Sequence, residues 1–367
     1  MPPDSPDSHS GNAAPKAPFV FATCKQGWEK ALKDEAKSIP EGLRPAFMRP
    51  GLITWKCEVP PTADFVLPGI FARMSGHSIG TCKDAADLAS KLGEVKRHTL
   101  KLHVYPREFP EDGLPLEEWS RIDAFRTRLL KSLRDAGVAM DDDSETVLGD
   151  TVLDVIVEDD LAAPFFAGWH RHGANTNPTP GGIPRAVIPL ESPSRAWLKL
   201  VQALAFAGLE TKNTHPLRGK IAVELGSAPG GASYALLQRG MRVMGIDPGA
   251  MDPRVLNYRT PQGGIPFKHL QMPAGEVDPN LLPPQADLLI SDLNLAPAVM
   301  IRLVKKMQAQ VQASLLILTL KINDRAVFAS LQENLTAIRD FAPGPIRATH
   351  LPGNRDEICV VAGRLGS

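Results

Sequence analysis

The chain reads Ile221-Ala-Val-Glu-Leu-Gly226-Ser-Ala-Pro-Gly-Gly231, an apolar run that ends in a turn of glycine and proline. A short amphipathic segment follows at 232–239, and a second apolar run, 241–246, ends at Asp247. This order predicts a strand, a loop, a helix and a second strand, which is one nucleotide-binding half of a doubly wound sheet. Glycines let the backbone approach a ligand closely, and an acid about 20 residues after such a loop can bind ribose hydroxyls.

The spacing of the glycines narrows the class of nucleotide. A dinucleotide fingerprint reads G-x-G-x-x-G, whereas here Gly226 is followed by three residues, Pro229 among them, and then by Gly230 and Gly231. No lysine follows at the position that a P-loop requires, so the pattern disfavours a pyrophosphate or triphosphate cradle. A tight turn with a purely structural role is the alternative.

Composition and charge limit the broad class of protein. The 367 residues suffice for two domains, and the 41 basic residues balance the 41 acidic ones. Zero net charge counts against a protein that coats nucleic acid, but it allows a local basic groove. The four cysteines are scattered and contain no C-x-x-C pair, which is typical of reduced thiols. Without a long apolar run or a signal-peptide core, we expect a cytoplasmic protein with no membrane attachment.

The chain divides into four expected parts. Residues 1–17 are rich in Pro, Ser and Asp, which predicts a disordered tail. Residues 18–172 mix expected strands and helices without a glycine-rich ligand loop, which predicts an α+β module that binds a partner. Proline and glycine crowd residues 173–193, which predicts a linker. Residues 194–367 alternate strands and helices throughout, which predicts an α/β domain with a Rossmann-like sheet.

The individual elements follow from the apolar periodicity. In the first module, strands are expected at 18–23, 51–57, 100–105, 151–157 and 165–169, and helices at 28–37 and 116–136. The Pro-rich stretch 263–284 is expected to be irregular. His170 and His172 stand beside the linker without a cysteine or carboxylate cluster, so we expect a polar rim there and predict no metal site.

Four polar residues stand where an α/β sheet places its chemistry. Ligands and catalytic groups lie at the carboxyl ends of the strands, and those ends carry Asp292 and Lys321. Lys199 comes from a helix expected to begin at Ser194, and Glu357 opens the last expected strand. Taken singly, each has a commonplace alternative, which is a solvated lysine, a helix-capping aspartate or a surface glutamate.

In this order, the four residues resemble the K-D-K-E tetrad of the FtsJ-like RNA ribose 2′-O-methyltransferases. The turn Ala228-Pro-Gly-Gly231 resembles the motif with which these enzymes bind S-adenosylmethionine (SAM). Other segments are similar to the RlmM-type bacterial members, which carry an N-terminal RNA-binding THUMP domain and methylate a cytidine ribose in 23S ribosomal RNA. They are Lys25-x-Gly27-Trp-Glu29-Lys30, Gly182-Ile-Pro-Arg185, Ser192-Pro-Ser-Arg-Ala-Trp-Leu-Lys199, Arg239-Gly-Met-Arg-Val243 and Asn354-Arg-Asp-Glu357.

The resemblance implies a cofactor, a site and a partner. SAM is the implied cofactor, and 23S ribosomal RNA or a pre-ribosomal particle is the implied partner, bound by a THUMP-like module at 18–172. Related enzymes place an acid against the adenine after the third strand; here Gln271 stands in that stretch and is expected to take its place. The remaining implied SAM-binding residues are Gly226, Ser227, Ala228, Pro229, Gly230, Gly231, Asp247 and Asp292. The oligomeric state is not indicated.

The tetrad also has a chemical rationale. A ribose hydroxyl is a poor nucleophile, so an enzyme must align it with the methyl group and assist proton loss. A lysine serves as a base only if burial or a second cation lowers its pKa. We therefore expect Lys321 to be the general base beside Lys199, Asp292 to orient the lysines, and Glu357 to hold the partner lysine.

Two other functions stay open at this point. A small-molecule O-methyltransferase is compatible with zero net charge, whereas a catalytically inactive RNA-binding homologue is disfavoured by the presence of both lysines. The sequence Asp292-Leu-Asn-Leu differs from the D-P-P-Y motif of enzymes that methylate base amino groups, which favours a ribose oxygen as target.

Overall fold

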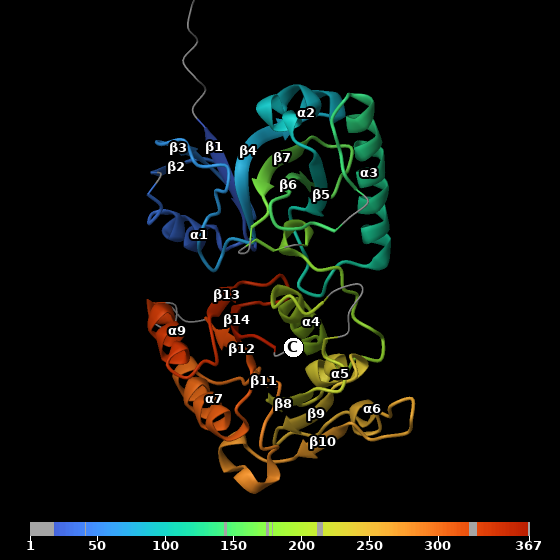
Figure 1. The fold of residues 1–367 in the computed structure, drawn as a ribbon, viewed down its shortest axis with the longest axis vertical. Coiled ribbons are helices and arrows are strands. Elements are labelled where there is room, and N and C mark those ends of the chain that lie inside the picture. Colours follow the sequence, from blue (N-terminus) through green and yellow to red (C-terminus); the bar gives the residue numbers. More distant parts are fainter. Residues whose placement is uncertain are drawn as a thin grey trace, which may run out of the picture.

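The computed structural model describes residues 18–40, 42–142, 145–173, 176–177, 179–210, 216–322 and 329–365. It contains two seven-stranded sheets, one from each half of the chain, which follow one another along the long axis of the molecule (Figure 1). The expected α/β class, with a Rossmann-like sheet in the C-terminal half, is confirmed. The tail expected at 1–17 lies outside the described residues.

The sheet of the N-terminal half is mostly antiparallel. Its order is β2-β3-β1-β4-β7-β6-β5, and only the β5–β6 pair is parallel. Helices α2 and α3 bury Leu88 and Leu133 against one part of this sheet, whereas α1 buries Leu32 near Trp55. The elements are β1 (Phe19–Thr23), α1 (Glu29–Ala36), β2 (Leu43–Arg49), β3 (Leu52–Cys57), β4 (Met74–Cys82), α2 (Ala85–Lys91), β5 (Leu100–Pro106), α3 (Leu116–Asp135), β6 (Thr151–Val157) and β7 (Phe165–Arg171).

Three elements of this half, β2, β4 and α2, did not follow from the apolar pattern. β2 carries Pro45, which cannot donate to a ladder; the strand tolerates it because it lies at the sheet edge and its register shifts there. β4 is interrupted by glycines, and a Cβ on Gly76 would stand 2.3 Å from the carbonyl oxygen of Trp169. β4 needs glycine where its backbone packs closely against β7, so it lacks the alternating apolar side chains by which a strand is predicted.

The prediction of a polar rim at His170 and His172 is wrong. Both residues are buried, and His170 is completely inaccessible. The Nδ1 atom of His170 lies 2.5 Å from an Asp154 carboxylate oxygen on the neighbouring strand. His170 and Asp154 therefore form a buried polar contact inside the N-terminal half.

The C-terminal half contains a doubly wound sheet. Its order is β10-β9-β8-β11-β12-β14-β13; β14 runs antiparallel to both of its neighbours, and the other pairs are parallel. Helices α4 and α5 cover one face, and α7 and α9 cover the other (Figure 1). The elements are α4 (Ala196–Phe206), β8 (Ile221–Leu225), α5 (Gly231–Gln238), β9 (Arg242–Ile246), α6 (Pro253–Leu256), β10 (Phe267–Leu270), β11 (Leu288–Ser291), α7 (Pro297–Val311), β12 (Leu315–Lys321), α9 (Leu331–Arg339), β13 (Ile346–Thr349) and β14 (Glu357–Gly363).

The stretch expected to be irregular at 263–284 contains the edge strand β10. This strand is only four residues long, and it pairs with β9 on one side alone. Such a short strand between proline-rich turns has too few residues to show an alternating pattern.

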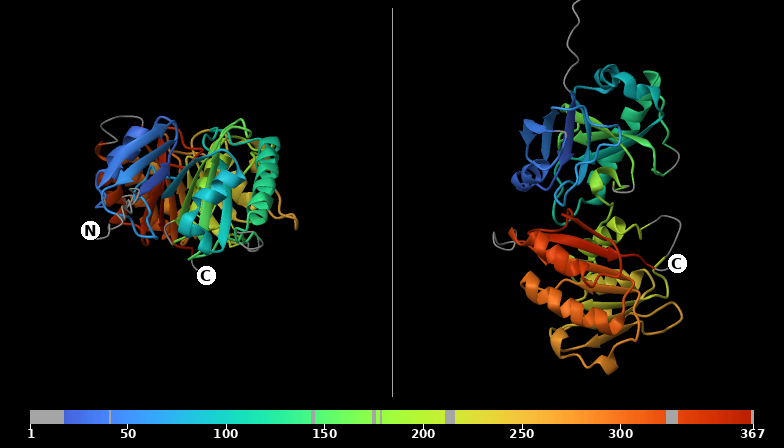
Figure 2. Two further views of the ribbon diagram at one scale, coloured as in Figure 1. Left: turned by 90° about the horizontal axis from the view of Figure 1, so that it is seen from above. Right: turned by 60° about the vertical axis from the view of Figure 1, so that its left-hand side comes forward.

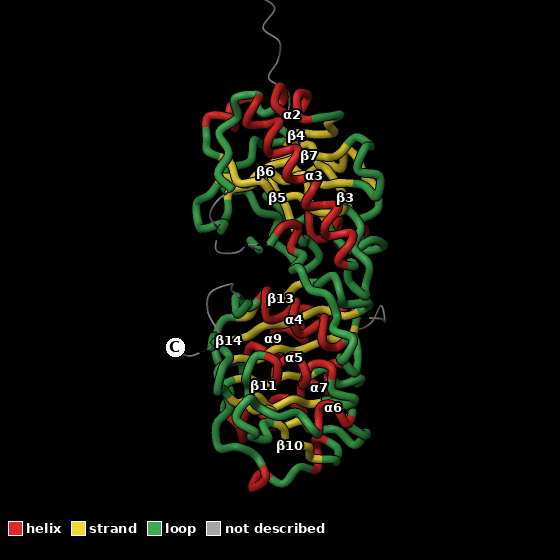
Figure 3. The backbone as a smooth tube through the Cα atoms, turned by 90° about the vertical axis from the view of Figure 1, so that its right-hand side faces the viewer, coloured by secondary structure: helices red, strands yellow, loops and turns green. Residues whose placement is uncertain are grey.

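The two halves contact one another through an aromatic cluster. The rings of Trp28 and Phe71 stack at 5.2 Å, and His350 lies edge-on to both, at 4.9 and 5.8 Å. The His350 backbone N–H donates to the carbonyl oxygen of Ile70 at 2.9 Å. The right-hand view of Figure 2 shows the resulting end-to-end arrangement, and Figure 3 shows β13 and β14 at the end of the C-terminal sheet nearest the N-terminal half.

The order of the C-terminal sheet fixes where a ligand can bind. The strand order reverses at β8, whose neighbours are β9 and β11, and such a switch point opens a crevice at the carboxyl ends of the strands. Within the described ranges, no helix is both long and apolar enough to cross a membrane.

Candidate functional site

The glycine-rich turn joins β8 to α5 and is required for packing. Gly226 and Gly230 have positive φ angles of 80° and 115°. A Cβ on Gly226 would stand 3.0 Å from the Asp292 carbonyl oxygen, and one on Gly231 would stand 2.3 Å from the Ser194 Oγ. The turn is thus pressed against the end of β11 and the segment before α4. The same glycines that open the backbone to a ligand also bring Asp292 and α4 to the site.

The central residues of the turn are anchored to the protein. Ser227 is buried, and its Oγ lies 3.7 Å from the Met251 sulfur, so its side chain packs inward. The backbone N–H of Ala228 donates to Asp247, and the Pro229 carbonyl accepts from the N–H of Asp252 at 3.0 Å. Because the Ser227 side chain is buried, only the backbone of Ser227 is available to a ligand.

Asp247 lies directly after β9 at the edge of the crevice. Its Oδ1 accepts from the Gly249 N–H at 2.6 Å, and its Oδ2 accepts from the Ala228 N–H at 3.2 Å. A carboxylate has about four acceptor sites, so both oxygens keep capacity for a ligand hydroxyl. Gln271 is exposed after β10, with its Nε2 3.5 Å from the Pro248 carbonyl oxygen, and so lies beside the Asp247 turn.

The structure brings Lys199, Asp292, Lys321 and Glu357 together. The Lys199 Nζ lies 3.0 Å from Asp292 Oδ2 and 2.7 Å from Glu357 Oε2. Lys321 ends β12 and pairs with Glu357 in the β12–β14 register, and its Nζ forms an ion pair with the other carboxylate oxygen, Oε1. One carboxylate therefore bridges both ammonium groups.

The charges of this cluster shift one another. Burial alone would raise the pKa of Glu357, but the two lysines outweigh it and lower the pKa to about 2. Burial alone would lower the pKa of Lys199, but the carboxylates of Asp292 and Glu357 outweigh it and raise the pKa above its usual value. Glu357 is therefore ionised and Lys199 protonated over the whole neutral pH range.

The sequence did not indicate two further polar residues near the cluster. Glu224 lies on β8, is 1% exposed and accepts a hydrogen bond from the Ser233 Oγ. Burial raises its pKa to about 8, so it is largely neutral at pH 7. Asn354 is equally buried, and its Nδ2 lies 3.5 Å from Glu357 Oε2. An acid inside an apolar strand was the one available signal for Glu224.

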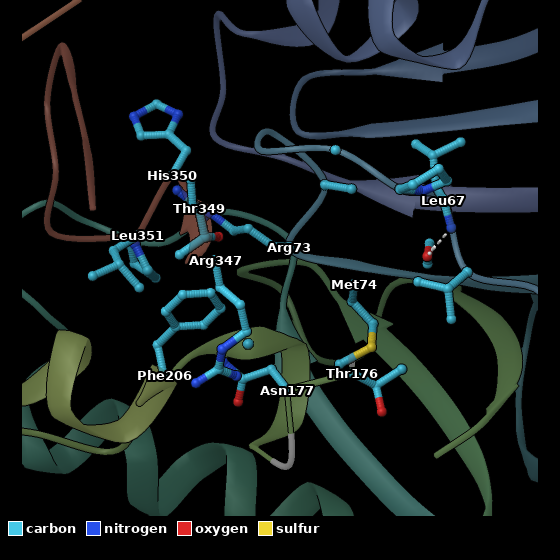
Figure 4. Close-up of a pocket in the computed structure, with 18 residues that line it drawn as sticks. Leu67, Arg73, Met74, Thr176, Asn177, Phe206, Arg347, Thr349, His350 and Leu351 are labelled. Atoms are coloured by element: carbon cyan, nitrogen blue, oxygen red, sulfur yellow. Dashed lines mark hydrogen bonds between the residues drawn. The ribbon is translucent and has the colours of Figure 1, made fainter. Parts of the chain in front are cut away.

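A cavity of about 370 Å³ lies between the two halves and contains none of the predicted site residues. Figure 4 shows Arg347 beside Phe206, with Arg73 approaching from the N-terminal half. The Arg347 guanidinium carbon stands 4.9 Å from the Phe206 ring centroid. None of the 18 residues that line the cavity is acidic, and the buried Nε and Nη2 of Arg73 have no hydrogen-bond partner among the described residues.

Among the described residues, no three His, Cys, Asp or Glu side chains are grouped so that they could hold a metal ion.

The C-terminal half is similar to a known family of methyltransferases. The family model described as FtsJ-like methyltransferase matches residues 193–334. A ribosomal RNA large subunit methyltransferase M from Alkalilimnicola ehrlichii is 30% identical over 256 residues, 69% of this chain and 66% of that protein. One from Halorhodospira halophila is 32% identical over 188 residues, 51% of this chain and 52% of the relative. The chain thus spans about half the length of several curated relatives that it matches.

Among solved structures, TrmN from Thermus thermophilus aligns over 94% of this chain and 99% of its own, at 15% identity and a TM-score of 0.32.

The raised pKa of Glu224 predicts a pH dependence of stability. The unfolded carboxyl titrates near 4.5 and the folded one near 8, so the folded state holds the proton more tightly and stability falls as the pH rises between these values. Glu224→Gln removes this effect. The melting temperature of wild type minus that of Glu224→Gln should therefore decrease from pH 5 to pH 8. Glu94→Gln, at an exposed position, is the control. If the melting temperature of wild type minus that of Glu94→Gln fell with pH by the same amount, the assignment to Glu224 would be contradicted.

Proposed function

Because residues 193–334 form an FtsJ-like methyltransferase domain, we propose that this protein transfers a methyl group from SAM to a ribose 2′-hydroxyl of RNA. The observation that carries the proposal is the meeting of Lys199, Asp292, Lys321 and Glu357 beside the Gly226–Gly231 turn. The names of the relatives support ribosomal RNA of the large subunit as the substrate. A cytidine in 23S ribosomal RNA and a cytoplasmic location complete the proposal.

The residues at the crevice fit SAM. Asp247 offers carboxylate oxygens to ribose hydroxyls and the turn 226–231 offers backbone groups; Gln271 lies beside the Asp247 turn, and we propose that it contacts the adenine. SAM, when bound, supplies a methyl group that its sulfonium charge has already activated. Asp292 contributes negative charge at the end of β11, next to the turn, which favours a cationic ligand there.

We propose that Lys321 first loses its ammonium proton to solvent and that the neutral amine then accepts the proton of the ribose hydroxyl. Lys199 is held by two carboxylates, which raise its pKa and favour its protonated form, so it is a poor base. Among the carboxylates of the described residues, the Nζ of Lys321 forms an ion pair with Glu357 alone. Lys199 then serves as a fixed positive charge, and Glu357 holds the side chains of both lysines in position through its two carboxylate oxygens.

RNA binding is proposed for residues 18–172, as a THUMP-like module followed by a linker at 173–193. Two arginines and no acid line the cavity between the halves, so its field favours a phosphate. The Nε and Nη2 of Arg73 have no hydrogen-bond partner among the described residues, so the guanidinium keeps an unpaired positive charge beside the cavity that attracts a phosphate.

The activity itself is tested by methyl transfer. Purified protein, labelled SAM and 23S ribosomal RNA from cells that lack this protein should give a new 2′-O-methyl group, located by mapping the modified nucleotide. Label transfer to small hydroxylated molecules but not to RNA would favour the small-molecule alternative. SAM and RNA binding without any transfer would indicate an inactive homologue.

Replacing Asp247 by Ala should weaken SAM binding. A hydrogen bond to a charged group contributes on the order of 1.5–3 kcal/mol, so the dissociation constant should rise about 10-fold or more. Calorimetric titration with SAM measures this change. Asp252→Ala, which alters a neighbouring acid that caps α6, serves as the matched control. Equal affinity in Asp247→Ala and wild type would remove Asp247 from the site.

Replacing Lys321 by Ala should slow methyl transfer by roughly 10²–10⁴-fold, the usual range for loss of a general base, and leave SAM affinity nearly unchanged. The measurement is the single-turnover rate with saturating SAM and RNA over a range of pH. Retention of more than about a tenth of the wild-type rate would show that the proton leaves by another route.

Replacing Arg73 by Met should weaken RNA binding without loss of stability, because the buried Nε and Nη2 have no hydrogen bond to lose among the described residues. The salt dependence of RNA binding should also decrease by about one phosphate contact. The exposed Arg97→Met, remote in sequence and paired with Glu94, is the control. RNA affinity equal to wild type, or a marked fall in melting temperature, would assign Arg73 a structural role.

A further inference from the structure

We infer that Lys25 and Glu111, both in the N-terminal half, are positioning residues for the reaction, because they hold the segment that carries Glu357. This inference rests on the proposed function, since it concerns the carboxylate that bridges the two lysines. It assigns the N-terminal half a part in building the catalytic site, in addition to any contact with RNA.

Lys25 and Glu111 bind two consecutive residues, Asn354 and Arg355, of the turn before β14. The Lys25 Nζ donates to the Asn354 carbonyl oxygen at 2.7 Å and to Glu111 Oε1 at 2.7 Å. The other Glu111 oxygen, Oε2, accepts from Arg355 Nε at 2.6 Å. The Lys25 side chain is 15% exposed, so its bonds lie largely outside bulk water and are stronger for it. The turn is therefore fastened to the N-terminal half at residues 354 and 355.

The fastened turn leads directly to the bridging carboxylate. The Asn354 side chain lies 3.5 Å from Glu357 Oε2, which is the oxygen that pairs with Lys199. On the opposite side, the Gly353 N–H donates to Gln202 Oε1 at 2.7 Å, and Gln202 lies on α4, three residues after Lys199. The turn is thus held between α4 and the N-terminal half, with Glu357 at its end.

The same N-terminal segment also contacts the start of α4. The Arg195 Nη2 donates to the Glu111 carbonyl oxygen at 2.9 Å, and Arg195 forms an ion pair with Asp112. Arg195 directly precedes α4, the helix that carries Lys199. Residues 111 and 112 therefore contact the segments that directly precede α4 and β14, the two elements that carry Lys199 and Glu357. Their displacement would change the relative position of the two charges.

Lys25 is expected to act by positioning the catalytic groups and not by binding RNA. Two donors of the Lys25 ammonium are already used by protein acceptors, which leaves one for a ligand. Loss of Lys25 should therefore act on the alignment of the reacting groups. A misplacement of about 1 Å at such a site can cost on the order of 10²-fold in rate.

The first test is Lys25→Met in the full-length protein. The single-turnover rate with saturating SAM and 23S ribosomal RNA should fall about 10-fold or more, whereas the dissociation constants of both ligands should stay within about twofold. Lys25→Arg keeps a cation and should recover most of the rate. Lys101→Met is the matched control, because it removes the 2.8 Å Lys101–Asp141 ion pair inside the same half. Its rate should equal that of wild type.

The second test is a double-mutant cycle with Glu357→Gln. If Lys25 acts through Glu357, Lys25→Met should cost much less in the Glu357→Gln background than in wild type. Melting curves establish that each variant is folded. Should Lys25→Met fail to fold, Glu111→Gln, which keeps the shape of the side chain, takes its place in the same cycle.

The outcomes separate this inference from the proposed function. No methyl transfer to RNA by wild type would refute the proposed function. An active wild type with an equally active Lys25→Met would refute the positioning role alone. A rate loss that adds fully to that of Glu357→Gln, or that resides wholly in RNA affinity, would also refute it. A rate loss at unchanged affinity that disappears in the Glu357→Gln background supports it.

Discussion

The C-terminal half depends on one carboxylate held between two ammonium groups. Glu357 is 5% exposed, and a buried charge is tolerated only when it is paired and hydrogen-bonded. Lys199 and Lys321 supply that pairing, and Asp292 balances the second positive charge. The cluster therefore contains two positive and two negative groups, which is why it can lie at the edge of an apolar sheet without a net charge. Removal of any one member would leave the cluster with an unbalanced charge.

Backbone geometry brings these four residues together from distant parts of the sequence. The β12–β14 register places Lys321 opposite Glu357, as a cross-strand pair. The close approach of Gly231 to Ser194 places the start of α4 against the turn 226–231. The close approach of Gly226 to Asp292 places the end of β11 against the same turn. A Cβ at either glycine would separate the elements by a few tenths of an ångström or more. The packing of two glycines and one ladder therefore fixes the distances between the charges.

Much of this arrangement could be predicted from the sequence, because parallel strands present their chemistry at their carboxyl ends. The turn 226–231, Asp247, Asp292 and Lys321 follow from apolar runs and what ends them. The contacts of Lys25 and Glu111 could not be predicted, since they depend on how two separately recognisable halves meet. β2 and β4 were missed for a local reason: Pro45 is tolerated only because β2 is an edge, and Gly76 is small because β7 lies against it. His170 was misplaced because a histidine beside a proline-rich stretch looks solvent-facing until its buried partner Asp154 is known.

The place of β14 in the sheet has a consequence for the timing of biosynthesis. β14 lies between β12 and β13, although both of these are translated before it. A nascent chain that has emerged only as far as β13 therefore has an open strand edge at β12, and unpaired edges favour association with other chains. It also lacks the carboxylate that Lys199 and Lys321 share. The ribosome must release residues 357–363 before the lysines acquire their common counter-ion, so the charge cluster can form only after β14 has been translated.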